Sequence, residues 1–523
     1  MTSSRALARA GLIMSAAFLV SRILGWARIV VIVRTFAPGP DLDAFFTAFR
    51  LPDLVFQLVA AGALASAVVP IVSGLFGRDE DARAWRVVST IANLMMAGLL
   101  VLAVIVLIAA PPIIRAIAPG FTDAEWSRTV DLTRIMILSP IFLALGSLVT
   151  SVLNARNRFA VSAVAPIVYN LAIIGAAIFL APTLGVTGLA IGVVSGSVAH
   201  LAIQLPSLRA LGYRYERRVD LAEPEARQAL RLMAPRALGL GAGQITFVVV
   251  NSLASTMATG SVALFNVAFT LLQIPIGIIG VPLGTVVLPS LSREAALGRI
   301  DEFAALLSRA IRLLLFVMLP ITGIAAVLRR EIVELLFASP TFGTAAIDLT
   351  AATLLAFLTG LTAHALIAVL ARAFYARQNT TIPVAAAILA VIVNSTLAAV
   401  LAAPFGLPGL GLAIAIAAWL ETIVLFMLLR RALPQLAIRP IALLGAQSLV
   451  VAIGGSLAAA GVAAGLGLAL GGDPSRAGLL VRIGVAGIVW LLTSAAIAVV
   501  LRIGELTSMI GLMADLIRRP RRA

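Results

Sequence analysis

The sequence predicts an all-α polytopic membrane protein with about 14 transmembrane helices, arranged as two parallel six-helix lobes plus two C-terminal helices. Of its 523 residues, 61% are hydrophobic and 12% are charged, and the mean hydropathy is +1.10. Soluble domains contain roughly 45–50% apolar and about 25% charged residues. Apolar runs of the ~20 residues that cross a bilayer recur along the chain. Short arginine-rich segments separate these runs.

Each apolar run is interpreted as one transmembrane span. The predicted spans are 11–36, 45–76, 87–110, 132–153, 161–181, 186–206, 229–255, 262–290, 306–328, 349–371, 383–403, 409–429, 441–470 and 479–501. Arg5 and Arg9 precede the first run as they would in a signal peptide, but no convincing small-residue cleavage site follows. The first run is therefore expected to be a retained span.

Two stretches recur and divide the chain into similar halves. Residues 154–158 match 375–379 at an offset of 221 (375 − 154), and 66–73 match 285–292 at an offset of 219 (285 − 66). The first six spans and the next six are thus predicted to be parallel copies of one unit, a plan typical of transporters. The predicted parts are a first lobe at 1–206, a cytoplasmic linker at 207–231, a second lobe at 232–430, two further spans at 431–502 and a basic amphipathic tail at 503–523.

The formal charge of +16 is unevenly distributed, and all 39 basic residues are arginines. The loops on one predicted side carry most of them, namely Arg78, Arg83, Arg86, Arg156, Arg158, 209–231, 293–312, Arg372, Arg377, Arg430, Arg431 and Arg439. The other side carries far fewer, namely Arg115, Arg128, Arg329, Arg330, Arg476 and Arg482. The richer side, with both termini, is therefore predicted to be cytoplasmic. This pattern argues against nucleic-acid binding.

Several functional classes are excluded by what the chain lacks. It has no cysteine and only two histidines, which excludes disulfides and Cys-based metal sites and argues against a His-rich metal centre. It has no phosphate-cradling glycine loop with Lys-Ser/Thr, and no supported Ser/His/Asp set. We therefore expect a non-enzyme with no cofactor. Transport would depend on a Na⁺ or H⁺ gradient, the membrane potential or a partner.

The first span contains two arginines where a membrane helix should be driest. Arg22 and Arg28 lie ~120° apart on a helix, with Ser21 and Gly25 on the arc between them. An arginine near the bilayer centre costs roughly 2.5–3.5 kcal/mol on insertion scales. We therefore expect both guanidinium groups to face one cavity and a charged ligand. The alternative is that they snorkel or pair with carboxylates elsewhere.

Further polar residues lie in later spans. Arg50, Asp53 and Gln57 form one stripe at i, i+3 and i+7, which is a second part of the predicted substrate site, or alternatively a local ion pair. A possible cation site is predicted from three other polar residues, Asn251, Asn394 and Glu421, which could bind a cation through their oxygens. Interhelical hydrogen bonding is the alternative for these.

Several motifs together resemble the MurJ (MviN) family of lipid-linked peptidoglycan precursor flippases, in the multidrug/oligosaccharidyl-lipid/polysaccharide exporter superfamily. The matching stretches are 21–28, 43–54, 62–70, 118–121, 153–159 with 165–166, 280–292 and 374–378. The resemblance implies a multi-pass protein of the bacterial plasma membrane, with two six-helix lobes and two extra helices forming a lipid-tail groove. It also implies a cationic cavity for a pyrophosphate-sugar headgroup, alternating access from the inner to the outer leaflet, and cell-wall synthesis proteins as possible partners.

The family's site residues carry over only in part. Arg22 and Arg28 match its first-span cavity arginines, and Arg50 matches a basic position at the start of the second span. The departures from the family pattern are Phe56 and Gln57 in place of adjacent basic residues, Ala61 in place of an acidic one, Phe269 and Thr270 in place of Asp-Arg, and Gln273 in place of a further acidic residue. Thr270 and Gln273 are retained as expected headgroup-site positions.

Three functional hypotheses follow. The leading one is a flippase for a polyprenyl-pyrophosphate-linked glycan, in which Arg22 and Arg28 clamp the diphosphate. The second is a cation-coupled multidrug or other polysaccharide-lipid exporter, for which intramembrane carboxylates are scarce, essentially Asp53 and Glu421. The third is a membrane scaffold or a glycan-polymerising enzyme, and the absence of a large loop domain disfavours the enzyme.

Overall fold

The computed structural model describes residues 3–59, 63–469 and 475–507, together with their side chains except at 3–16, 59, 63–67, 232 and 234–242. Within these ranges the chain forms helices and no β-strand, apart from one isolated bridge between Ser339 and Phe342. The all-α prediction is therefore confirmed. The chain divides into two compact units, which we call unit 1 (Met1–Ala263) and unit 2 (Leu264–Ala523).

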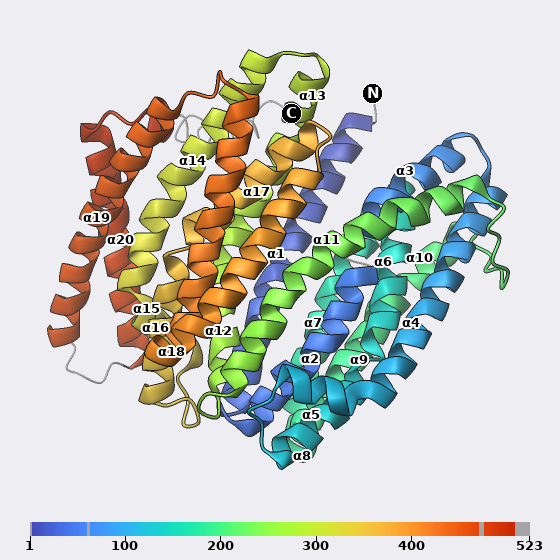
Figure 1. The fold of residues 1–523 in the computed structure, drawn as a ribbon, viewed down its shortest axis with the longest axis horizontal. Coiled ribbons are helices and arrows are strands. Elements are labelled where there is room, and N and C mark those ends of the chain that lie inside the picture. The colour runs from blue at the N-terminus through green and yellow to red at the C-terminus, as the bar shows by residue number, and fades with distance from the viewer. Residues whose placement is uncertain (1–2, 60–62, 470–474, 508–523) are drawn as a thin grey trace. The chain divides into compact units, whose positions relative to one another are not determined.

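Unit 1 is a bundle in which helices distant in sequence pack together (Figure 1). Its helices are α1 (Ser3–Thr35), α2 (Pro40–Val59), α3 (Ala63–Gly77), α4 (Asp81–Ile117), α5 (Asp123–Met136), α6 (Ser139–Ala155), α7 (Phe159–Phe179), α8 (Ala181–Leu184), α9 (Val186–Ala202), α10 (Leu205–Ala210) and α11 (Pro224–Ser255). Helix α1 lies against α7, and α7 against α9. Helix α11 packs on α2, α3 and α4.

Unit 2 is organised around α17 and α18. Its helices are α12 (Ser261–Pro275, whose first turn belongs to unit 1), the π-helix η1 (Ile276–Gly280), α13 (Val281–Ala296), α14 (Ile300–Val327), α15 (Arg329–Phe337), α16 (Thr344–Leu358), α17 (Leu361–Ala376), α18 (Thr381–Ala432), α19 (Ile438–Ala469) and α20 (Arg476–Val500). Helices α19 and α20 form a hairpin against α14. The Arg482–Glu331 ion pair, 3.0 Å long, ties α20 to α15.

The helices confirm a multi-span membrane protein but not the count of 14. Among the described residues, nine helices are long and apolar enough to cross a membrane, or ten when the bent pair α16 and α17 is taken as one span. The predicted span at 45–76 corresponds to α2 and α3, which flank residues 60–62 outside the described residues, so its continuity stays a prediction. Helix α2 carries four charged residues and α3 is only 15 residues long, so neither resembles a simple span.

The predicted spans at 383–403 and 409–429 run into one another as α18. The bend between them lies at Gly406, whose φ of +59° is the left-handed conformation that glycine adopts without strain. Gly185, which ends α8, has φ +57° and lies 221 residues earlier (406 − 185). This offset equals the one between the repeated stretches 154–158 and 375–379. The lobe boundaries stay a prediction, and the tail beyond residue 507 lies outside the described residues.

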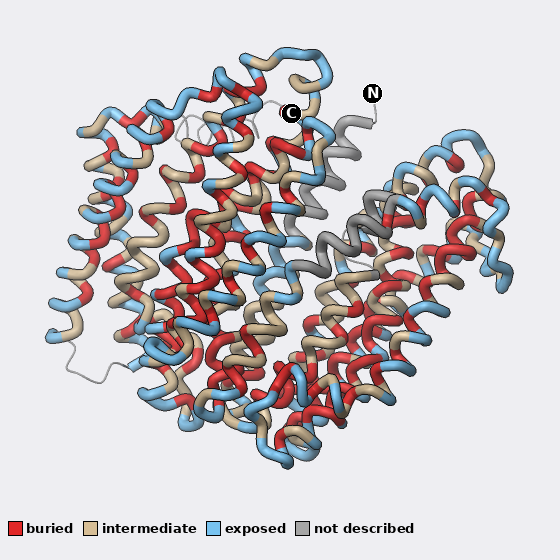
Figure 2. Tube along the Cα trace, viewed as in Figure 1, coloured by how far each residue is buried: buried red, intermediate tan, exposed pale blue. Residues whose placement is uncertain are grey.

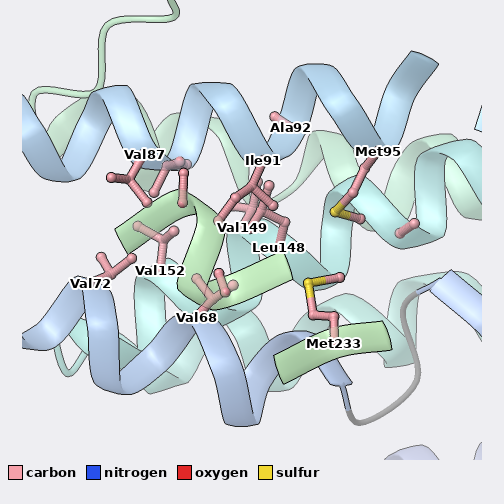
Figure 3. Close-up of a cluster of buried hydrophobic side chains, with 14 of the residues drawn as sticks. Val68, Val72, Val87, Ile91, Ala92, Met95, Leu148, Val149, Val152 and Met233 are labelled. Carbon is pink, nitrogen blue, oxygen red and sulfur yellow. The ribbon is translucent and has the colours of Figure 1, made fainter. Parts of the chain in front are cut away.

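A continuous apolar core holds unit 1 together beneath the first turns of α4. Figure 3 shows Ile91 and Met95 of α4 meeting Val68 of α3, Val149 of α6 and Met233 of α11. The core lies on one side of α4, while Leu100, Val104 and Ile108 on another side are 48–75% exposed. Figure 2 shows the same division between buried and exposed positions along most helices. Exposed apolar bands of this kind are expected where a helix faces lipid.

Candidate functional site

Helix α1 directs its two arginines to different surroundings within unit 1. The guanidinium carbon of Arg28 lies 5.8 Å from the centre of the Tyr169 ring on α7. Arg22 is exposed, and its guanidinium carbon lies 5.2 Å from the ring of Phe18, itself 50% exposed. Among the described residues, neither arginine forms an ion pair within 4 Å. Both cations therefore remain available to an anionic ligand.

Helix α7 approaches α1 closely at Ser21 and Gly25, near the two arginines. The side chain of Asn170, which is 7% exposed, donates hydrogen bonds to the backbone oxygens of Ser21 (3.3 Å) and Pro166 (3.0 Å). A Cβ on Gly25 would lie 4.0 Å from the Asn170 Oδ1 atom. The predicted residues Ser21 and Gly25 thus lie at the contact between α1 and α7. This contact sets the register of the two helices, in which Arg28 lies beside Tyr169.

The stripe on α2 forms the second part of the site. Gln57 donates a hydrogen bond to the carboxylate of Asp53, which also lies in the electrostatic field of Arg50 and Arg28. The guanidinium carbon of Arg50 lies 5.1 Å from the ring of Phe247 on α11. Residues of α1 and α2 therefore come together around Asp53. Phe56, by contrast, packs against the apolar core.

The cluster is cationic as a whole. Around Asp53, Arg28 and Arg50 contribute two positive charges and Asp53 one negative charge, so the formal sum is +1, and Arg22 adds a further charge farther along α1. Guanidinium groups match phosphate oxygens in a two-pronged geometry and bind them as charge-assisted hydrogen bonds. The Tyr169 ring lies beside Arg28, which donates a hydrogen bond to its hydroxyl, and the Phe247 ring lies beside Arg50. The arrangement can bind a multiply charged anion such as a diphosphate.

Tyr169, Asn170 and Phe247 were not anticipated from the sequence. Tyr169 and Asn170 are adjacent polar residues in an otherwise apolar run of α7. Phe247 lies in an apolar run of α11 and is followed by three valines. A tyrosine or asparagine inside an apolar span is a weak signal by itself. Their role depends on the packing of α7 on α1 and of α11 on α2, which the sequence does not reveal.

Asp43 is a further residue whose role the sequence did not reveal. Its carboxylate is 2% exposed and accepts N–H hydrogen bonds from Gly260 (2.6 Å) and Ala263 (2.7 Å). Asp43 of α2 thereby caps the N-terminus of α12. A negative charge at this end is stabilised by the helix dipole. Its neighbour Asp41 instead pairs with Arg128.

Asn251, one of the candidate cation ligands, is a structural link in unit 1. It is 3% exposed, and its amide donates to Thr47 Oγ1 (3.2 Å) and to the backbone oxygen of Ile117 (3.0 Å). When the Thr47 hydroxyl is instead the donor, it bonds to the Oδ1 atom of Asn251 at 3.3 Å. The contacts of Asn251 are therefore hydrogen bonds that link α11 to α2 and α4.

The remaining predicted residues lie in unit 2. Thr270 on α12 donates its hydroxyl to the Asn266 backbone oxygen at 2.8 Å, and Gln273 is exposed. Asn394 is 2% exposed, and in the part of the chain that the structure describes neither of its amide atoms has a hydrogen-bond partner. Glu421 lies on the other half of α18, beyond Gly406, within electrostatic reach of Tyr375. The grouping of Asn251, Asn394 and Glu421 around a cation stays a prediction.

Comparisons with known proteins identify the family of this chain. A family profile described as lipid II flippase MurJ matches residues 32–466. Among curated relatives, the lipid II flippase MurJ of Burkholderia cenocepacia is 32% identical over 433 residues, covering 81% of this chain and 84% of the relative. The probable lipid II flippase MurJ of Rhizobium tropici is 33% identical over 428 residues, covering 79% of each.

Solved structures share the fold. A lipid II flippase MurJ in an inward closed conformation superposes with a TM-score of 0.77 at 23% identity, covering 94% of this chain and 99% of that one. An inward-facing multidrug resistance MATE family transporter of the MOP superfamily gives a TM-score of 0.66 at 16% identity, covering 81% and 98%. The transporter-like helical fold expected from the sequence is therefore confirmed.

Proposed function

The chain belongs to the lipid II flippase MurJ family, and from this premise we propose that it translocates a lipid II-like, polyprenyl-pyrophosphate-linked glycan across the bacterial plasma membrane. Its relatives are named for this substrate, and the proposal extends that substrate to this chain. The direction proposed is from the inner to the outer leaflet. The chain is a multi-pass membrane protein, and we propose that both its termini are cytoplasmic.

The observation that supports this function best is the cationic cluster around Asp53. Arg28 and Arg50 converge on Asp53 from two helices, and Arg22 lies two turns from Arg28 on α1. Hydrogen bonds to a charged partner contribute about 1.5–3 kcal/mol each. Two or three arginines can therefore offset much of the cost of bringing a diphosphate out of water.

Asp53 has a separate part in the proposed cycle. A site of arginines alone would hold the diphosphate too strongly for release, because charge attraction is poorly screened away from water. The carboxylate of Asp53 competes with phosphate for the same guanidinium groups. Held in place by Gln57, it attracts Arg28 and Arg50 electrostatically and so weakens their hold on the headgroup. The free energy of headgroup binding is then modest, so that the headgroup can both bind and leave.

The proposed transport breaks no covalent bond of the substrate, so the protein acts as a transporter and not as an enzyme. We propose that alternating access of the two repeated lobes exposes the site to one leaflet and then the other. The driving force is proposed to be a Na⁺ or H⁺ gradient or the membrane potential. A headgroup carrying negative charge would respond to that potential, at ~2.3 kcal/mol per charge per 100 mV.

A complementation experiment tests this function. Arg22→Ala, Arg28→Ala and the double variant are expressed in a bacterium depleted of its own lipid II flippase, and externally exposed lipid II is measured by labelling intact cells. We expect the double variant to lose export and each single variant to reduce it at least tenfold. Arg209→Ala, an exposed arginine of α10, serves as the control with equal charge loss. Full export by the double variant at normal protein levels would refute the clamp.

A second candidate function is a cation-coupled multidrug exporter. Glu421 favours it, because this intramembrane carboxylate has no ion pair among the residues that the structure describes. Drug-susceptibility profiling of a deletion strain separates the two functions. Broad hypersensitivity with unchanged lipid II export would favour the exporter.

A further inference from the structure

An extended segment between α10 and α11 lies along the first turns of α4. This segment, Tyr213–Leu221, is called the strap here. The Asn93 amide donates to the backbone oxygens of Glu216 (2.8 Å) and Arg218 (3.0 Å). The backbone N–H of Glu216 donates to Ser89 Oγ at 3.2 Å. The strap is therefore fixed by hydrogen bonds to its backbone, and its side chains are left for other contacts.

Further contacts hold the two ends of the strap. The backbone N–H of Asp220 donates to Thr90 Oγ1 at 3.1 Å, and the Tyr215 hydroxyl donates to Asn93 Oδ1 at 2.5 Å. Ser89 and Thr90 have no exposed surface beneath it. Just beyond the strap, Arg83 binds Glu223 and Glu225 at 3.2 Å and 3.0 Å. Arg83 also donates a hydrogen bond to Glu80, so its guanidinium ties the start of α4 to the start of α11.

The position of the strap along α4 places it at the edge of a bilayer. The exposed apolar band of α4 runs from Leu100 to Ile108, with Val104 at its middle. Asn93 precedes Val104 by 11 residues, a distance of about 16 Å along a helix, and lies within ~20° of the same face. Half the hydrocarbon thickness of a bilayer is ~15 Å. The strap thus covers the lipid-facing side of α4 at the depth of the lipid headgroups.

The exposed side chains of the strap match that depth. Arg214, Arg217 and Arg218 are exposed, and in the described part of the chain none has an ion pair. The two carboxylates of the strap, Glu216 and Asp220, are half-buried, and Asp220 accepts the N–H of Ala222 at 3.0 Å. The surface that the strap presents is therefore basic.

Apolar and aromatic side chains are interleaved with these arginines. Tyr215, Val219 and Leu221 are 51%, 43% and 50% exposed. Aromatic and aliphatic groups beside arginines are typical of the membrane–water interface, where the apolar part enters the acyl region and the cation reaches phosphate. An aqueous protein surface would be expected to bury such residues or replace them.

We propose that the strap is a binding site for the phosphate headgroups of anionic phospholipids in the leaflet that surrounds the first turns of α4. Arg217 and Arg218 bind the phosphate, Arg214 adds charge, and Tyr215, Val219 and Leu221 contact the upper acyl chains. The hydrogen bonds to Asn93 hold the arginines at headgroup depth. This site lies on the outer side of α4 and is separate from the cluster around Asp53.

Lipid titration of the full-length protein tests the proposal. Detergent-solubilised protein is titrated with dioctanoyl phosphatidylglycerol and with dioctanoyl phosphatidylcholine, and binding is followed by thermophoresis. We expect phosphatidylglycerol to bind more tightly, with the preference falling as salt rises from about 0.15 M to about 0.5 M. The double variant Arg217→Gln/Arg218→Gln should weaken phosphatidylglycerol binding by about fivefold per arginine and leave phosphatidylcholine binding unchanged.

Two further variants distinguish a built site from general charge. Arg430→Gln/Arg431→Gln removes the same charge from an exposed arginine pair at the end of α18 and should leave the preference within about twofold of the wild type. Asn93→Ala keeps every arginine but frees the strap, and should weaken phosphatidylglycerol binding severalfold. Equal losses in the two double variants, or no preference in the wild type, would overturn the proposal.

Discussion

Asn157 and Gln378 adopt the same left-handed backbone conformation, with φ of +57° and +58°, and lie 221 residues apart (378 − 157). In each turn the next residue's N–H bonds to the carbonyl oxygen five residues back, Arg158 to Leu153 at 2.8 Å and Asn379 to Phe374 at 3.0 Å. Each turn joins two packed helices, α6 to α7 and α17 to α18. The repeat seen in the sequence is thus also a repeat of backbone geometry.

The turn at Gln378 makes a prediction about stability. A left-handed conformation costs roughly 1–2 kcal/mol for most residues other than glycine, and less for asparagine. Gln378→Gly should therefore stabilise the protein by about 0.5–1 kcal/mol, and Gln378→Val should destabilise it by at least ~1 kcal/mol. The measurement is thermal unfolding of purified protein in detergent. Because asparagine already tolerates this conformation, Asn157→Gly should change the midpoint less than Gln378→Gly.

The cap formed by Asp43 leads to a second prediction. Asp43→Ala would leave the buried N–H groups of Gly260 and Ala263 without an acceptor, at a cost of about 2–4 kcal/mol. Asp43→Asn keeps one acceptor oxygen and should lose about half of that. Asp41→Ala is the matched control, because its partly exposed ion pair with Arg128 contributes less than ~1 kcal/mol. Equal unfolding midpoints for Asp41→Ala and Asp43→Ala would contradict the cap.

The sequence predicted those features of the site that depend on helix periodicity alone. The i, i+4 spacing of Asp53 and Gln57 was enough to expect their contact, and the cost of membrane arginines marked Arg22 and Arg28. It did not predict that Arg28 meets Tyr169 while Arg22 stays exposed, because that depends on where α7 crosses α1.

Breaks within helices were also hard to predict. Hydropathy placed two spans around Gly406 but not the direct passage between them, which a single left-handed glycine accomplishes. Asp43 was overlooked because its partners are backbone groups 217 and 220 residues away. A contact between a side chain and distant backbone groups cannot be predicted from the pattern of side chains in the sequence.

The balance of charge around Asp53 gives a third prediction. Asp53→Asn raises the formal charge of Arg28, Arg50 and residue 53 from +1 to +2 while keeping an oxygen that can accept the Gln57 hydrogen bond. A diphosphate headgroup should then bind about three- to tenfold more tightly, at roughly 1 kcal/mol for a partly solvated charge. Export should fall, because the headgroup is released more slowly. Binding of purified lipid II and export in cells measure the two effects, and weaker binding by Asp53→Asn would contradict this role.

The α19–α20 hairpin supplies the last prediction, because its attachment depends on glycine. A Cβ on Gly455 of α19 would collide with the Ser494 hydroxyl of α20 and lie 3.1 Å from Cδ1 of Trp490. Gly455→Leu should therefore push the two helices apart and destabilise the protein by about 2–3 kcal/mol. Gly461 is on the same helix with nothing within 4 Å of a built Cβ, so Gly461→Leu should be neutral or stabilising by up to ~1 kcal/mol through helix propensity. Thermal unfolding of the two variants in detergent measures the difference. If both glycines tolerate leucine equally, the close approach of α19 and α20 is not what holds the hairpin in place.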